Sequence, residues 1–366
     1  MAVKSLVLKS FLLLLLASVV LLLLTSDALW QTKNTAHTSF NETSPWLIIF
    51  WSTIFGSKVD LHLAWKKGEC PVACEVTSNH SRVKEADGFV VHARDSNMIP
   101  PVDSVPWILF TQENPVYTPV LTDAIFMSKF KLLRSYRLDS DFPDPTFYKP
   151  DLTPPIPFEE KTAMVFAAFS NCEPVRIEYM KQLMKFIQID SYGNCLKNKQ
   201  GLTARYGKDF KQHKAELSRK YKFTLVFFNQ DCDYIVDAQL TDALSAGSVP
   251  VVMGTDKLDQ FLPGNLRSSI INVRDFENPK LLADYITYLS SNKDEYSKYL
   301  EWKRKGFGDI EGTNIGKCWM PKYPLYFQIC MALSEGRIHK DGLKVDICKK
   351  RAFKDWGINP RAQVDL

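Results

Sequence analysis

Two side chains with useful chemistry stand beside predicted elements of this sequence. Glu113 comes just after the apolar run Trp107–Thr111, and a carboxylate there could take a proton from an attacking hydroxyl group. Arg176 stands near the start of a predicted helix, and its planar guanidinium suits the paired oxygens of a phosphate. Each also has a plain structural interpretation, as a solvated loop carboxylate and as a surface arginine of an amphipathic helix. The two residues are therefore candidates for a general base and a phosphate ligand.

A second group of polar residues follows the apolar run Phe223–Phe228. Asn229 and Tyr234 lie in the turn after this run, and Asp237 begins the next predicted helix. Parallel sheets bind ligands at the carboxyl ends of their strands, so this turn is a candidate nucleotide-binding edge. Ordinary turn chemistry also explains Asn229, and Asp237 has the alternative role of a helix N-cap.

An Asp-x-Asp triplet at residues 139–141 has the form by which many nucleotide-sugar enzymes hold Mn²⁺. The triplet lies just before a proline-rich segment, away from the predicted nucleotide edge. Arg137 stands two residues before Asp139 and offers it an ion-pair partner. We therefore predict a cap or an ion pair at this triplet and no metal site.

The elements that would position these residues alternate between short apolar strands and longer amphipathic helices. Three runs predict buried strands of a first unit: Trp46–Trp51, Gly88–Val91 and Trp107–Thr111. Further strands are predicted at Ala163–Phe169, Ile187–Tyr192, Phe223–Phe228, Val249–Met253 and Ser269–Val273, with helices at Glu173–Phe186, Tyr206–Arg219, Asp237–Ala246 and Pro279–Ser290. This alternation indicates an α/β fold with parallel sheets.

The first residues predict membrane attachment. Lys4 and Lys9 precede an uncharged stretch, Ser10–Ser26, that is rich in Leu and Val. A cleaved signal peptide and an uncleaved anchor both fit, and the length favours the anchor. Because the basic residues precede the stretch, the short N-terminus would stay in the cytosol and the body would enter a lumen.

The complete predicted organisation has seven parts. They are a cytosolic tail at 1–9, a transmembrane signal anchor at 10–26, a stem at 27–45, an N-terminal domain at 46–142, a proline-rich linker at 143–160, a C-terminal domain at 161–350 and a tail at 351–366. The chain of 366 residues is 45% hydrophobic, which excludes a disordered protein, and its net charge of +5 is too small to predict a nucleic-acid partner.

Glycosylation patterns and cysteines agree with a lumenal body. Asn41 and Asn79 each begin an Asn-x-Ser/Thr pattern, which predicts glycosylation in a secretory chain. No cysteine or histidine group has zinc spacing. Four cysteines are interpreted as disulfides that join the first domain to the C-terminal part: Cys70, Cys74, Cys318 and Cys330. The pairing of the other four stays open: Cys172, Cys195, Cys232 and Cys348.

Several blocks in the same order resemble the α1,3-fucosyltransferase family. Residues 227–234 read FFNQDCDY and residues 243–254 read ALSAGSVPVVMG, which is similar to the donor motif of that family. Other similar blocks are Glu113-Asn114-Pro115, SYRLDSD at 135–141, Ser170-Asn171-Cys172, DSYGNC at 190–195 and Phe261-Leu262-Pro263. The resemblance covers about residues 46–335.

The resemblance implies two Rossmann-like domains with a cleft between them, the GT-B type, and a single-pass type II Golgi membrane protein. The implied reaction is an inverting transfer of L-fucose from GDP-fucose, in α1,3 linkage, to GlcNAc of glycoprotein or glycolipid glycans. Glu113 would be the general base, and four residues would surround the donor: Arg176, Asn229, Tyr234 and Asp237. No metal cofactor would be required, although Mn²⁺ or Mg²⁺ could stimulate transfer.

The sequence departs from the family pattern just after Tyr234. Where the family has Thr-Glu-Lys, this chain has Val236-Asp237-Ala238, so a lysine that resembles a diphosphate ligand is absent. A charge-assisted contact of that kind contributes about 1.5–3 kcal/mol. The alternative hypothesis is therefore a catalytically impaired lumenal protein that binds glycans or assists an active relative.

Overall fold

The computed structural model describes residues 44–66, 68–202, 209–348 and 350–358. The predicted cytosolic tail, the membrane anchor, most of the stem and Asn41 lie outside these ranges. Within them, no helix is both long enough and apolar enough to cross a bilayer. Asn79 is described and exposed, and its side-chain oxygen accepts hydrogen bonds from the backbone N–H and the hydroxyl of Ser81, at 3.1 and 2.8 Å.

The chain forms two compact units, each built from more than one stretch of sequence. The first contains the described residues up to Phe110, then Asp123–Leu133 and Tyr323–Lys344. The second contains Thr111–Thr122, Arg134–Lys322 and the described residues from Val345 onward. These bounds differ from the predicted domain ranges. Glu113 belongs to the second unit, and so do the described residues of the predicted tail after residue 350.

A seven-stranded sheet has the order β2-β3-β1-β4-β5-β6-β7. Its strands are β1 (Trp46–Phe50), β2 (His62–Trp65), β3 (Cys74–Thr77), β4 (Gly88–His92), β5 (Trp107–Thr111), β6 (Leu132–Ser135) and β7 (Phe142–Pro143). β1 pairs in parallel with β3 and β4, β4 pairs in parallel with β5, and β2 is an antiparallel edge strand. The three predicted strands of this part are confirmed as β1, β4 and β5. β2 and β3 were not predicted.

A second sheet has five strands in the order β12-β11-β10-β8-β9, and all four neighbouring pairs in it are parallel. Its strands are β8 (Ala163–Ala167), β9 (Ile189–Ser191), β10 (Tyr221–Phe227), β11 (Val249–Met253) and β12 (Ile271–Asn272). All five predicted strands are confirmed, most with shorter bounds. The chain runs from β8 outward to β9 and then returns to the other side of β8 as β10. The topological switch point therefore lies between β8 and β10.

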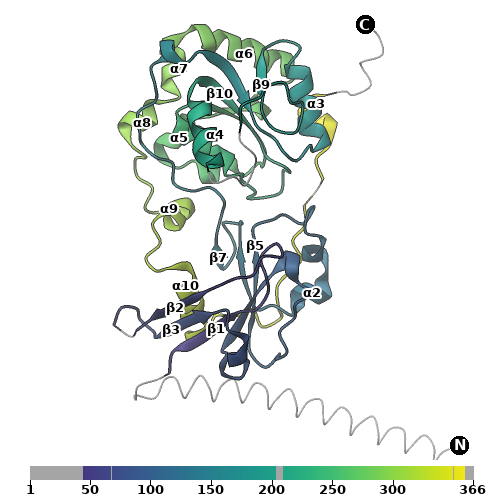
Figure 1. The fold of residues 1–366 in the computed structure, drawn as a ribbon, viewed down its shortest axis with the longest axis vertical. Coiled ribbons are helices and arrows are strands. Elements are labelled where there is room, and N and C mark those ends of the chain that lie inside the picture. Colours follow the sequence, from purple (N-terminus) through teal and green to yellow (C-terminus); the bar gives the residue numbers. More distant parts are fainter. Residues whose placement is uncertain (1–43, 67, 203–208, 349, 359–366) are drawn as a thin grey trace, which may run out of the picture. The chain divides into compact units, whose positions relative to one another are not determined.

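Short helices connect the strands (Figure 1). The first unit has α2 (Ala124–Ser128) and α10 (Leu325–Ser334). The second has α3 (Pro174–Leu183), α4 (Phe210–Arg219), α5 (Gln239–Ala246), α6 (Pro279–Ser291), α7 (Lys293–Lys298), α8 (Glu301–Lys305) and α9 (Asn314–Trp319). The four predicted helices are confirmed as α3 to α6, although part of the predicted start of α4 lies outside the described residues.

The second sheet is buried on both faces because its strands are almost continuously apolar. Successive residues of β10 point to opposite faces, so Leu225 joins one hydrophobic cluster with α3 and α6, and Val226 joins another with α5. Leu183 and Leu240 are fully buried on these two faces. Helices thus cover both sides of the sheet and leave its strand ends to carry polar residues.

Three disulfides are present among the described residues: Cys74–Cys330, Cys172–Cys195 and Cys232–Cys348. The Cys74–Cys330 bridge joins β3 to α10, as expected for a link from the N-terminal part to the C-terminal part. The expectation for Cys70 and Cys318 is wrong, because both are free thiols. Burial raises the pKa of the Cys318 thiol to about 11, so it stays protonated at neutral pH.

Gly247 ends helix α5 with a left-handed backbone, at φ 67°. A Cβ added there would lie 2.5 Å from the Cβ of Pro155. We expect Gly247→Ala to lower the free energy of unfolding by about 2–4 kcal/mol, from backbone strain and overpacking together. Gly336→Ala is the matched control, because Gly336 has φ +65° and nothing within 4 Å of its added Cβ, so only about 1–2 kcal/mol should be lost. Equal losses in calorimetric unfolding would contradict the contact with Pro155.

Candidate functional site

The switch point of the second sheet brings together residues that the sequence keeps far apart. β8 leads into the segment before α3, and β10 leads into the turn that contains Asn229 and Tyr234. Both segments leave the carboxyl edge of the sheet, where open α/β folds bind ligands. The described residues of this edge carry three of the arginines of the second unit: Arg176, Arg274 and Arg351.

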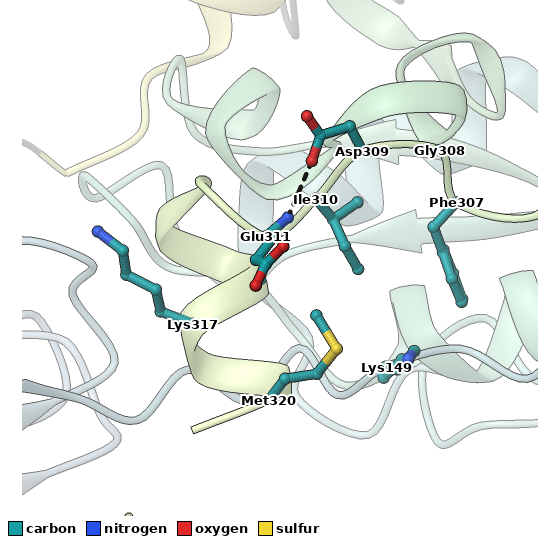
Figure 2. A pocket seen from close by; sticks show the side chains of 9 residues that line it. Lys149, Phe307, Gly308, Asp309, Ile310, Glu311, Lys317 and Met320 are labelled. Carbon is teal, nitrogen blue, oxygen red and sulfur yellow. Dashed lines mark hydrogen bonds between the residues drawn. The ribbon is translucent and has the colours of Figure 1, made fainter. Parts of the chain in front are cut away.

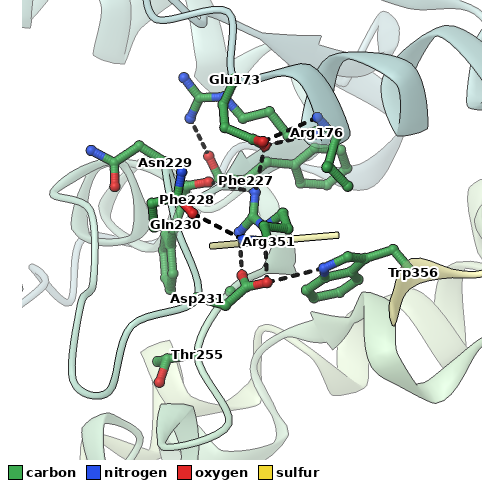
Figure 3. A network of polar contacts seen from close by, with 12 residues as sticks. Glu173, Arg176, Phe227, Phe228, Asn229, Gln230, Asp231, Thr255, Arg351 and Trp356 are labelled. Atoms are coloured by element: carbon green, nitrogen blue, oxygen red, sulfur yellow. Dashed lines mark hydrogen bonds and ion pairs between the residues drawn. The ribbon is translucent and has the colours of Figure 1, made fainter. Parts of the chain in front are cut away.

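Arg176 spans the switch point from the first turn of α3. Its guanidinium donates to the carbonyl oxygen of Phe227 at the end of β10, at 2.8 Å, and to that of Asn171 after β8. Figure 3 shows the side chain reaching from the helix toward the Phe227 carbonyl. The Nε atom is buried and has no hydrogen-bond acceptor among the described residues. Burial lowers the pKa of Arg176, while the nearby Asp237 carboxylate acts in the opposite direction.

The amide groups at the start of α3 are already capped. Glu173 accepts the backbone N–H groups of Val175 and Arg176, at 3.1 and 2.9 Å, so its carboxylate occupies the positive end of this helix. The amides of this turn are therefore not open to a phosphate. The side chain of Arg176, rather than the helix terminus, is the cation that α3 contributes.

Asp237 performs a similar function at the start of α5. The N-cap residue is Ala238, which has no side-chain cap, and the Asp237 carboxylate accepts the backbone N–H of Gln239 at 2.9 Å. The structural alternative for Asp237, a carboxylate that satisfies a helix amide, is thus present. Its negative charge also supports the charged form of Arg176, because a nearby carboxylate acts to raise the pKa of that arginine.

Tyr234 has an unusual backbone for a residue with a bulky side chain. Its φ angle is 64°, in the left-handed region. The Arg137 guanidinium lies 5.2 Å from the centre of the Tyr234 ring, and Phe261 contacts the same ring from the apolar cluster beneath. Residues held in such conformations concentrate at functional sites, where the surrounding structure enforces them.

Glu113 is connected to the same turn through its neighbour. The backbone N–H of Glu113 donates to the Thr111 hydroxyl at 3.1 Å, and that hydroxyl donates to the Glu113 carbonyl at 2.9 Å. Asn114 is fully buried, and its side-chain amide donates to the side-chain oxygen of Asn229 at 3.2 Å. The structure therefore places the segment of the predicted base and the predicted nucleotide turn in one hydrogen-bonded arrangement within the second unit.

The Asp-x-Asp triplet forms the predicted ion pair. Arg137 holds Asp139 in a two-point contact, with both nitrogen–oxygen distances at 2.8 Å. Across the described ranges of the chain, no group of three or more His, Cys, Asp or Glu side chains is arranged to hold a metal ion.

Sequence reasoning missed a third buried charged residue of this edge, Arg351, which lies beside Arg176 and Glu173. Its guanidinium lies between Asp231 of the turn and Glu173, the N-cap of α3, and it also donates to the Phe228 carbonyl at 3.0 Å (Figure 3). Trp356 donates to the same Asp231 carboxylate at 3.0 Å. The signal available in the sequence was a tryptophan close to the chain end, in a segment predicted as a tail.

A second polar cluster lies at the corresponding edge of the first sheet. Asp95 accepts hydrogen bonds from Thr53 at 2.7 Å and from the backbone N–H groups of Phe55 and Gly56, each at 2.8 Å. Its other partner is the buried His92 at the end of β4, at 2.6 Å. The pKa of Asp95 is lowered to about 2, because these hydrogen bonds outweigh burial, which alone would raise it. Burial lowers the pKa of His92.

The lowered pKa of Asp95 predicts acid sensitivity. Its ordinary pKa of 3.8 falls to about 2 on folding, so the carboxylate contributes about 2 kcal/mol of stability above pH 4, which is lost as the pH falls from about 4 to 2. Asp95→Asn should remove this contribution and flatten the acid limb of the unfolding curve. Thr53→Val, which deletes one of the donors, should remove only part of it. An unchanged acid limb in Asp95→Asn would contradict this assignment.

A cavity of about 520 Å³ lies elsewhere in the second unit, beside α9 (Figure 2). Its floor is apolar, with Phe307, Ile310 and Met320. Its rim carries two lysines and two carboxylates, Lys149, Lys317, Asp309 and Glu311, so the charges balance. None of its lining residues belongs to the switch-point site.

The chain matches known families and proteins along most of its length. Residues 158–342 match the family model described as glycosyltransferase family 10 (fucosyltransferase), C-terminal part, and residues 43–146 match the model of the fucosyltransferase N-terminal part. A GDP-fucose protein O-fucosyltransferase 3 of Danio rerio is 31% identical over 300 residues, which are 74% of this chain and 61% of that protein. The alpha-(1,3)-fucosyltransferase B of Drosophila melanogaster is 28% identical over 300 residues, 75% of this chain and 66% of that protein.

Two further comparisons agree with these. A 4-galactosyl-N-acetylglucosaminide 3-alpha-L-fucosyltransferase of Gorilla gorilla gorilla is 30% identical over 275 residues, which are 70% of each chain. A crystal structure of an alpha1,3-fucosyltransferase has the same fold, with a TM-score of 0.51, 16% identity, and coverage of 84% of this chain and 96% of that chain. The match spans less than two thirds of the Danio and Drosophila relatives. The protein therefore belongs to glycosyltransferase family 10, the fucosyltransferases.

Proposed function

We propose that the protein transfers L-fucose from GDP-fucose, with inversion and in α1,3 linkage, to GlcNAc of a glycoprotein or glycolipid glycan. The observation that carries the proposal is the arrangement at the switch point of the second sheet. Arg176 lies beside the turn that contains Asn229 and Tyr234, and the hydrogen bond from Asn114 to Asn229 ties this turn to the segment of Glu113. The proposal thus takes its cation for the diphosphate and its carboxylate for proton transfer from the same unit.

The proposed reaction assigns a distinct step to each group. Glu113 accepts the proton of the acceptor hydroxyl while that oxygen forms a bond to the anomeric carbon of fucose. The bond between this carbon and the diphosphate breaks, and its electron pair leaves with GDP. Arg176 stabilises the negative charge that develops on the leaving diphosphate, because its buried guanidinium is poorly screened by water. Inversion follows because attack and departure occur on opposite faces of the sugar.

A protein hydroxyl is a second candidate acceptor. The Danio rerio relative is named a protein O-fucosyltransferase, and a protein hydroxyl would lose its proton to the same Glu113 carboxylate. A glycan panel and a panel of folded lumenal protein domains, assayed with the same radiolabelled GDP-fucose, would separate the two acceptor classes.

The location and the metal independence are parts of the same proposal. We place the protein in the Golgi membrane as a single-pass type II protein with a lumenal body, on the basis of the N-terminal sequence. Transfer should persist in EDTA, with at most stimulation by Mn²⁺ or Mg²⁺. Microscopy of a tagged full-length chain and an assay with chelator would test the two statements.

The alternative, a catalytically impaired protein, rests on Ala238. This residue is the N-cap of α5 and contributes no cation next to Asp237. Calorimetric titration of the lumenal body with GDP, GDP-fucose and GDP-mannose, followed by the transfer assay, decides between the two. Micromolar binding of GDP-fucose with transfer supports the enzyme. Failure to bind GDP at millimolar concentration, with binding restored in Ala238→Lys, supports the impaired protein.

A further inference from the structure

Four residues near the C-terminal end hold the turn after β10, three through direct bonds to it and Asp346 through Arg137. We define them as the C-terminal clasp: Asp346, Cys348, Arg351 and Trp356. They lie beyond residue 342, where the match to the family model ends. All four belong to the second unit, as does the turn Asn229–Tyr234.

Arg351 bonds the turn to the start of α3. Its Nε and one terminal nitrogen donate to the two Asp231 oxygens, the first at 2.8 Å. The other terminal nitrogen donates to Glu173 at 3.2 Å and to the Phe228 carbonyl at 3.0 Å, and the backbone N–H of Arg351 donates to the Gln230 side chain at 3.3 Å. The side chain is completely buried. Since these contacts use its guanidinium on every side, Arg351 is arranged to hold protein segments rather than a phosphate.

The other three clasp residues hold the same turn. Cys348 is covalently bonded to Cys232 in the turn, and Trp356 donates to Asp231. Asp346 pairs with Arg137 at 3.1 Å, and the Arg137 guanidinium lies over the Tyr234 ring. The turn is therefore fixed near both of its ends by one segment of chain.

The backbone of Tyr234 explains why such fixation is needed. A left-handed conformation of a non-glycine residue is strained and persists only when neighbouring structure enforces it. Cys232 and Ile235 are buried on either side of Tyr234, in a small apolar cluster that Cys348 joins. The clasp thus supplies the contacts that would compensate for this strain.

We propose that the C-terminal clasp holds the turn Asn229–Tyr234 in the conformation that binds the nucleoside diphosphate, and that Arg351 is a positioning residue for this ligand. The proposal rests on the proposed function of the site and adds a device outside the matched family region. Arg176 donates a hydrogen bond to the Phe227 carbonyl next to the turn. Displacement of the turn would therefore also displace the arginine that is proposed to bind the diphosphate.

The test uses Arg351→Lys, which keeps the charge and loses the forked contact, in the otherwise unchanged chain. We expect the dissociation constant of GDP and the KM for GDP-fucose to rise about 10- to 100-fold, with the KM for the acceptor unchanged. Hydrogen exchange of the backbone amides at 228–235 should become at least about tenfold faster. A double variant, Cys232→Ser with Cys348→Ser, should act in the same direction without touching any charge.

Lys303→Met is the matched control, because it alters another buried cationic side chain of the same unit that does not contact the turn. Lys303 donates to the carbonyls of Asp151 and Ser245, at 3.0 and 3.1 Å, at the opposite end of α5 from the turn. The Lys303→Met substitution should lower the melting temperature. It should leave the GDP affinity and the hydrogen exchange of the amides at 228–235 unchanged. The paired variant Cys74→Ser with Cys330→Ser is the corresponding control for the disulfide.

The outcomes separate this proposal from the proposed function. If GDP does not bind the unaltered protein, the proposed function fails, and the exchange measurement still tests the clasp. If GDP binds and Arg351→Lys changes neither GDP affinity nor exchange beyond the Lys303→Met control, the clasp proposal is overturned. If exchange rises and GDP affinity does not change, the clasp is structural and Arg351 is not a positioning residue for the ligand.

Discussion

Glu113→Gln should lower kcat for fucosyl transfer by about 10²- to 10⁴-fold, the range expected when a general base is lost. Glutamine has about the size of glutamate, but its amide cannot take the proton from the hydroxyl group of the acceptor sugar. The dissociation constant of GDP should stay unchanged, because the backbone turn of Glu113 with Thr111 and the Asn114–Asn229 hydrogen bond do not use the carboxylate. Steady-state rates at saturating GDP-fucose, with calorimetric GDP binding in parallel, provide the measurement.

Glu159→Gln is a suitable control, since Glu159 is an exposed carboxylate of the same unit that pairs with Lys293 at 2.7 Å. It should keep the transfer rate. Retention of more than about a tenth of the rate in Glu113→Gln would place the base at another residue.

The central elements of the fold were predictable because burial dominates them. The runs that form β10 and β11 are apolar at nearly every position, and such runs of this length, separated by amphipathic segments, have few alternatives to parallel strands. The turn that follows β10 could also be placed at a ligand-binding edge from strand order alone. Asn229 and Tyr234 do lie there, beside Arg176.

The elements that escaped prediction depend on distant partners. β2 and β3 are only four residues each, and β2 alternates exposed and half-buried positions, so local sequence gives a weak signal. The bounds of the units were hidden for a similar reason. Helix α10 packs on β1 and is bonded to β3 through Cys74–Cys330, a contact 256 residues apart in sequence. Long-range contacts of this kind have no local pattern.

The charge balance at the switch point was the least predictable property. The sequence gives Ala238 where the family has a lysine, which suggests a loss of positive charge. The structure adds Arg351 to the same edge, yet Asp231 and Glu173 neutralise it. Arg176 belongs to the same edge, and its guanidinium has a buried Nε without a hydrogen-bond acceptor among the described residues.

Arg176→Met should therefore raise the dissociation constant of GDP by about 10- to 100-fold, the equivalent of losing one charge-assisted contact. Methionine keeps part of the buried volume and removes the donor to the diphosphate. It also leaves the carbonyls of Phe227 and Asn171 without this partner, so a lower melting temperature should accompany the loss of affinity. Calorimetric titration at a temperature where the variant is folded measures the first effect, and differential scanning calorimetry the second.

Lys161→Met separates the two effects, because Lys161 is the counterpart of Arg176 at the opposite edge of the same sheet. It is buried, and its ammonium donates to the carbonyls of Arg219 and Tyr221, at 2.9 and 3.3 Å, where β10 begins. This variant should lose stability and keep its GDP affinity. If both variants weaken GDP binding equally, the effect is one of folding alone. If neither weakens it, the diphosphate binds without Arg176, and the carboxyl edge of β10 is not the nucleotide site.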